Sequence, residues 1–86
     1  MIQFIDKNNQ YFNIQDSDIL NIETEGSFLF ITLNNPLNKN DLYFIQKNTK
    51  CYIDNLEHNY KYHIYGREIS KYHNSLLYNL GIKLLN

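Results

Sequence analysis

The segment DSDILNIETEGSFLFITLNN, residues 16–35, carries the clearest structural signal in the chain. Its two apolar runs, one at 19–22 and one starting at Phe28, are separated by the short polar link ETEGS. The second run is rich in aromatic and β-branched residues, which favour strands. Gly26 can supply the positive φ that a tight turn requires. The segment therefore predicts an antiparallel β-hairpin.

The sequence on both sides of this hairpin predicts further strands. Residues 3–5 and 10–14 flank the polar turn DKNN, and residues 42–46 and 50–53 form a similar pair around KNT. Residues 34–41 contain the only proline and no apolar repeat, so they predict a loop.

The apolar period changes after residue 54. Leu56, Tyr60, His63 and Ile64 follow one another at i, i+4, i+7 and i+8, which is typical of one helical face. Asp54 or Asn55 can cap the start of such a helix and Gly66 its end. We therefore expect a helix at 55–65, then an edge strand at 67–71 and a closing strand at 76–85. The expected fold is mostly β with one short helix, in a single domain spanning residues 1–86.

Size and composition limit the possible classes of protein. The chain has 86 residues, of which 43% are apolar and 20% charged, as expected for one globular domain. Cys51 is the only cysteine, and the longest apolar run has four residues, so we expect a cytoplasmic protein without a disulfide or a membrane segment. The net charge is −1, but residues 1–46 carry six acidic and two basic side chains, and residues 47–86 carry three acidic and six basic ones. An anion-binding face would therefore belong to the second half.

A dense polar cluster, residues 71–75, precedes the last apolar run. His73 and Ser75 lack the G-x-S-x-G motif of a nucleophile, and the three histidines and one cysteine lack the spacing of a metal site. The three glycines stand alone, so there is no glycine-rich phosphate loop. The sequence predicts no enzyme, no metal and no cofactor.

The same cluster suits binding better than catalysis. Lys71 and Arg67 can contact phosphate, and Asn74 can pair with the edge of adenine. His73 and Ser75 can donate hydrogen bonds to phosphate or to their own backbone. A simpler alternative is that Asn74 and Ser75 only close a turn.

The segment ISKYHNSLLYNLGIKLL, residues 69–85, resembles the signature of LytTR-type DNA-binding domains. The matching positions are Ile69, Lys71, His73, Ser75, Leu76, Leu77, Asn79 and Ile82. The hairpin within 12–33 and the expected helix at 55–65 are similar to the opening hairpin and the single helix of that family. Lys71 stands where the family usually has Arg, and the sequence ends before the family's last strands.

This resemblance implies an elongated fold of antiparallel β-sheets, usually the output domain of a bacterial response regulator. Such domains insert loops into successive major grooves of double-stranded DNA at direct repeats. It implies that Lys71, His73 and Ser75 contact DNA, that Asn74 reaches a base, and that Ser27 in the hairpin loop also contacts DNA. We therefore expect a sequence-specific DNA-binding regulator of transcription.

The alternative is a small protein-interaction module or inhibitor, of the kind that phages and mobile elements encode, which keeps the fold without binding DNA. Six of the eight tyrosines lie in the second half, at 52, 60, 62, 65, 72 and 78. Tyrosine is favoured at protein interfaces, although these rings could also complete a core without tryptophan. A homodimer joined through edge strands is compatible with either function.

Overall fold

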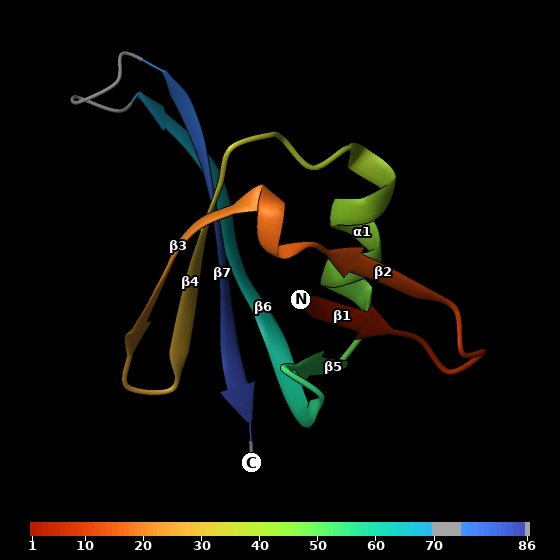
Figure 1. Ribbon diagram of the computed structural model, residues 1–86. Coiled ribbons are helices and arrows are strands. Elements are labelled where there is room, and N and C mark those ends of the chain that lie inside the picture. Colours follow the sequence, from red (N-terminus) through yellow and green to blue (C-terminus); the bar gives the residue numbers. More distant parts are fainter. Residues whose placement is uncertain (70–74, 86) are drawn as a thin grey trace.

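The computed structural model describes residues 1–69 and 75–85, which form one antiparallel seven-stranded sheet and one α-helix. The strands are β1 (Ile2–Ile5), β2 (Tyr11–Ile14), β3 (Ile19–Glu25), β4 (Phe28–Leu33), β5 (Lys50–Ile53), β6 (Leu56–Ile69) and β7 (Leu76–Leu85). The helix α1 spans Lys39–Lys47, and a 3-10 turn, η1 (Asp16–Asp18), precedes β3. The strand order is β2-β1-β5-β6-β7-β4-β3 (Figure 1). The predicted antiparallel, mostly-β fold is confirmed.

The long strand β6 joins the two halves of the sheet. Its first residues pair with β5, and from Asn59 to Ile69 it pairs with β7. The sheet curls about β6, so that β1, β2 and β5 lie across from β3, β4 and β7 (Figure 1). Side chains from both halves fill the space between them. The buried core consists of Ile2, Phe4, Ile14, Leu29, Ile31, Leu33, Ile45, Cys51, Tyr60, Leu80 and Ile82.

Helix α1 adds Ile45 to this core and is fixed there by a buried hydrogen bond. Tyr60 of β6 donates from its hydroxyl to the backbone carbonyl of Ile45 at 2.7 Å. A second tyrosine, Tyr65, accepts at 2.8 Å from the backbone N–H of Leu37, just before the helix. Each bond replaces the hydrogen bond to water that these polar groups lose when the chain folds.

The two predicted amino-terminal hairpins are confirmed. β1 pairs with β2 and β3 with β4, each antiparallel. Gly26 has a φ of 61°, the left-handed conformation expected for it. The closing strand, predicted at 76–85, is β7.

The predicted helix at 55–65 is wrong, because these residues lie in β6. Asp54 and Asn55 have φ values of 49° and 68°, so they form a two-residue hairpin turn between β5 and β6 and do not cap a helix. The helical spacing arises from a register shift between Tyr62 and Ile64, which interrupts the two-residue alternation. Gly66 is not among the residues with positive φ, and β6 continues through it to Ile69.

The predicted strand at 42–46 is also wrong, because these residues belong to helix α1. The predicted loop at 34–41 is wrong from residue 39 onward, where the same helix begins. Asn38 caps the helix, since its side chain accepts from the backbone N–H of Asp41 at 2.8 Å. The helix has nine residues, of which only Ile45 is buried. So short an element leaves almost no apolar period in the sequence, and the cap is its only clear signal.

Candidate interaction surface

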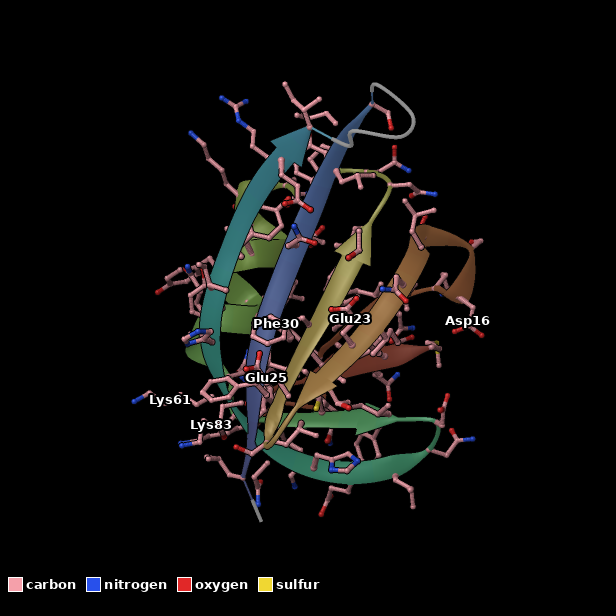
Figure 2. The ribbon with its side chains drawn as sticks, turned by 90° about the vertical axis from the view of Figure 1, so that its left-hand side faces the viewer. Asp16, Glu23, Glu25, Phe30, Lys61 and Lys83 are labelled. Atoms are coloured by element: carbon pink, nitrogen blue, oxygen red, sulfur yellow. The ribbon has the colours of Figure 1, made fainter. Side chains whose placement is uncertain are left out.

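Four strands, β3, β4, β7 and β6, present a second face that points away from the core. We call it the outer face, and Figure 2 looks onto it. In β4 the buried residues Leu29, Ile31 and Leu33 point inward, so the residues between them point outward. The registers of the neighbouring strands then assign the outward positions on β3, β7 and β6. The outer face comprises Asn21, Glu23, Glu25, Phe28, Phe30, Thr32, Lys61, His63, Ile64, Gly66, Glu68, Leu77, Asn79, Gly81 and Lys83.

These residues lie in rows that cross the four strands. The first row contains Glu25, Phe28, Lys83 and Lys61, which are successive cross-strand partners. The second row contains Glu23, Phe30, Gly81 and Ile64. The third row contains Asn21, Thr32, Asn79 and Gly66. Each of the first two rows therefore runs from an acidic residue on β3 to an aromatic residue on β4.

An aromatic cluster occupies the centre of the first two rows. The rings of Phe28 and Phe30 stack with centroids 6.2 Å apart, and the His63 ring lies 4.8 Å from that of Phe28. The Lys83 ammonium lies 5.7 Å from the Phe28 centroid, within cation–π range. The outer face thus has an apolar centre, whereas an antiparallel sheet with one solvated face usually places polar residues there.

Gly81 makes the aromatic cluster possible. A Cβ at this position would lie 2.9 Å from Cγ2 of Ile64 and 3.1 Å from the ring of Phe30. The two side chains therefore close over the backbone of β7. The shift in β6 places His63 and Ile64 together beside this strand, and Ile64 remains 51% exposed.

Charges of opposite sign flank the aromatic cluster. Glu23 and Glu25 lie on the edge strand β3, and Lys61 and Lys83 lie on β6 and β7, so β4 stands between the two pairs in the order of strands. In Figure 2, Glu23 lies on the other side of Phe30 from the two lysines, and Glu25 lies between Phe30 and Lys83. Among the described residues, none of these four groups forms an ion pair within 4.0 Å. Within the described residues, the hydrogen-bond partner of Glu23 is the amide of Asn21, which donates to it at 3.2 Å.

A shallow groove lies next to the cluster on the same face. Its lining comes from β3, β4, β6 and β7 and includes Leu20, Glu23, Thr32, Glu68, Ser75 and Leu77. Thr32, which lines the groove, donates to the side-chain oxygen of Asn79 at 3.0 Å. The groove joins the acidic side of the outer face to the exposed Leu20.

The residues predicted to contact DNA are distributed between the two ends of the sheet. Arg67 is exposed in β6, and Ser75 is exposed directly before β7. Ser27 lies in the β3–β4 turn at the other end, where its carbonyl accepts from the backbone N–H of Leu84 at 2.8 Å. Lys71, His73 and Asn74 lie outside the described residues. The structure therefore brings Arg67 and Ser75 to one end and separates Ser27 from them.

Most of the described tyrosines in the second half of the chain pack against the core. Tyr60 is fully buried, and three others, Tyr62, Tyr65 and Tyr78, pack against the core. Tyr65 and Tyr78 stack with centroids 6.2 Å apart. Tyr52 is on the surface, where its hydroxyl donates to Glu57 at 3.0 Å and, with nearby Lys50, lowers the pKa of that carboxyl. For these described tyrosines, completing the core is the main structural role.

The buried titratable groups are structural in character. Burial raises the pKa of the Cys51 thiol to about 12, which keeps it protonated and a poor nucleophile. Burial also raises the pKa of Tyr60 above its ordinary value, with a further contribution from Cys51. In the part of the chain that the structure describes, no three His, Cys, Asp or Glu side chains form a group that could hold a metal ion.

Comparisons with known proteins add no assignment. No family model matches the chain, and no significant match is found among curated proteins or among solved structures. Among the described residues, no helix has the length and apolar character needed to cross a membrane.

Sequence reasoning missed the outer face, although a signal for it was present. In FLFITL, residues 28–33, bulky apolar side chains occupy both alternating sets of positions. A strand of that kind has two apolar faces, and the core accounts for only one of them. Glu25 and the two lysines of the first row come from three strands, so only the register reveals that they share a row.

Proposed function

We propose that this protein is a non-enzymatic protein-binding domain whose outer face is the contact surface. The observation that carries the proposal is the cluster of half-buried Phe28 and Phe30 with exposed Ile64, which lies between charges of opposite sign. Aromatic residues are enriched at the centres of protein interfaces, and polar residues form their rims. The groove lined by Leu20 and Leu77 extends the same surface and offers space for a partner side chain.

Site-specific crosslinking tests this proposal. A photoreactive phenylalanine analogue would replace Phe28 on the outer face. In a matched control it would replace Tyr43, which is 62% exposed on α1, away from that face. After irradiation in the organism that carries the protein, we expect defined protein adducts from position 28, identified by mass spectrometry, and few from position 43. Equal adducts from both positions, or none from position 28, would contradict the proposal.

DNA binding is the second candidate, and one feature of β6 and β7 favours it. β4 pairs with β7 only as far as Tyr78, whereas β6 and β7 stay paired to Ile69 and Leu76. They therefore extend beyond the rest of the sheet as a two-stranded ribbon, a form that the DNA major groove admits. Arg67 is exposed on this ribbon, and Ser75 is exposed at its end.

The spacing between the two ends of the sheet also suits a duplex. Ser27 lies beside Leu84, nine positions from Ser75 along the chain, which corresponds to about 30 Å of strand. One turn of B-DNA is about 34 Å, so contacts at both ends would fall one turn apart. This arrangement agrees with the insertion of loops into successive major grooves that the LytTR resemblance implies.

Fluorescence anisotropy with a pool of duplexes at two salt concentrations tests the second candidate. We expect Arg67→Ala and Lys71→Ala to weaken binding to all sequences and to flatten its salt dependence, and Asn74→Ala to relax the preference at one base pair. Lys39→Ala, at an exposed position of α1, is the control, because it also removes one positive charge but lies outside the ribbon. Equal losses from Arg67→Ala and Lys39→Ala would contradict a role for the ribbon.

A further inference from the structure

The first row of the outer face places like charges together on one side. Lys61 and Lys83 are direct cross-strand partners, an arrangement that destabilises a sheet because the two ammonium groups repel each other. Glu25 lies at the other end of the row, on β3, with Phe28 next to it. Within the described residues no opposite charge within 4.0 Å neutralises either side. The row therefore suits a partner whose charges run in the reverse order.

We propose that the partner is a second copy of this chain, bound outer face to outer face about a two-fold axis parallel to the strands. This deepens the proposed function, on which it rests, by naming the partner of the same surface. Such an axis, placed between β4 and β7, sets β3 of one copy against β6 of the other and β4 against β7. Each row of one copy therefore faces the same row of the other copy in reverse order. Glu25 of one copy then faces Lys61 of the other, and Phe28 faces Lys83, in both directions at once.

Only this orientation of the axis matches the charges. A two-fold axis in the interface but perpendicular to the strands would place β3 on β3, and Glu23 and Glu25 of the two copies would repel each other. With the axis parallel to the strands, Phe30 of the second row faces Gly81, which Ile64 and Phe30 of the other copy cover, so the apolar clusters of the two copies meet there. The two sheets would then pack about 10 Å apart, with strands aligned to within about 30°.

The size of the face limits the strength of this dimer. Four strands spaced about 4.8 Å apart, over four or five outward rows, give roughly 500 Å² per copy. A standard stable interface buries about 800 Å² per partner, so the pairing belongs to the weak, transient class. Exposed ion pairs are also screened by salt. We therefore expect association at high protein concentration and low ionic strength, weakening as salt is added.

Charge reversal with complementation tests the pairing. One variant, Glu23→Lys with Glu25→Lys, makes both sides of the outer face basic. The other, Lys61→Glu with Lys83→Glu, makes both sides acidic. All four side chains are exposed, so circular dichroism should show that both variants fold like the original chain. Sedimentation velocity from about 10 μM to about 1 mM, at low and high salt, measures the association.

We expect the original chain to shift toward dimer with rising concentration, each variant alone to lose that shift, and an equimolar mixture of the two to regain it. Lys39→Glu with Lys47→Glu, on α1, is the matched control and should dimerise like the original. A chain that stays monomeric at about 1 mM in low salt, or a mixture that does not associate, would overturn the inference. If crosslinking at position 28 still captured a different protein, the proposed function would stand without the dimer. If the chain neither dimerised nor gave adducts at position 28, both the dimer and the proposed function would be refuted.

Discussion

At the scale of single residues, the absence of a side chain at Gly81 allows Phe30 and Ile64 to pack over β7 on the outer face. A Cβ there would press on Ile64 Cγ2 and on the Phe30 ring, at 2.9 and 3.1 Å. We expect Gly81→Ala to lower the free energy of unfolding by about 1–3 kcal/mol, the usual range for overpacking. Urea denaturation followed by circular dichroism measures the change.

The matched control for this prediction is Gly66→Ala on β6. Gly66 has open space where its Cβ would stand, and its φ is not positive. Adding a methyl group there reduces the freedom of the unfolded chain, so we expect unchanged or slightly higher stability. Similar losses from both substitutions would mean that strand glycines matter here for a reason other than the contact with Phe30.

At the scale of elements, the β5–β6 turn determines whether residues 55–65 form a strand. Asp54 and Asn55 both have positive φ, and glycine adopts such a conformation at lower cost than asparagine. We expect Asn55→Gly to raise the free energy of unfolding by about 0.5 kcal/mol. Asn59→Gly, in the exposed part of β6, should lower it by about 1 kcal/mol. Equal losses from both would contradict a two-residue turn at 54 and 55.

How far each element could be predicted depended on how regular its pattern was. The β3–β4 hairpin was predictable because a turn glycine separates two apolar runs. β6 was not, since the positions that predicted a helix come from both faces of the strand: Tyr60 points inward, and Ile64, beyond the register shift, points outward. The error at β6 also removes the helix at 55–65 as a point of similarity to LytTR domains.

At the scale of the whole molecule, the described part of the sheet has an apolar inner face, which forms the core, and an outer face with an apolar centre that nothing in the described residues covers. The inner face is covered by α1 and by the opposing half of the sheet, and the sequence predicted much of that core as strand residues. The outer face depends on pairings between distant segments, such as Lys61 with Lys83 and Phe28 with Lys83. A sequence pattern contains no register between strands, so this candidate site could not be derived before the fold was known.

The stability of the whole fold should depend on alkaline pH through Tyr60. Its ordinary pKa is 10.0, and burial raises the pKa in the folded state. The folded protein therefore holds the proton more tightly than the unfolded chain, so the contribution is fully present below pH 10 and is lost as pH rises above it. Cys51 acts in the same direction from its ordinary pKa of 9.0 upward, since burial raises the pKa of its thiol to about 12.

Tyr60→Phe separates this contribution from general alkaline unfolding. At pH 7 we expect the variant to lose about 1–3 kcal/mol, because the Ile45 carbonyl keeps its burial but loses its donor. Above pH 10 the stability of the variant should fall less steeply than that of the original chain, because one of the two buried acids is gone. Urea denaturation at pH 7, 9 and 10.5 measures both effects, and Tyr11→Phe, at a position 62% exposed, is the control. Parallel pH profiles for the original chain and Tyr60→Phe would show that the buried hydroxyl does not control alkaline stability, and would leave its bond to α1 as its only role.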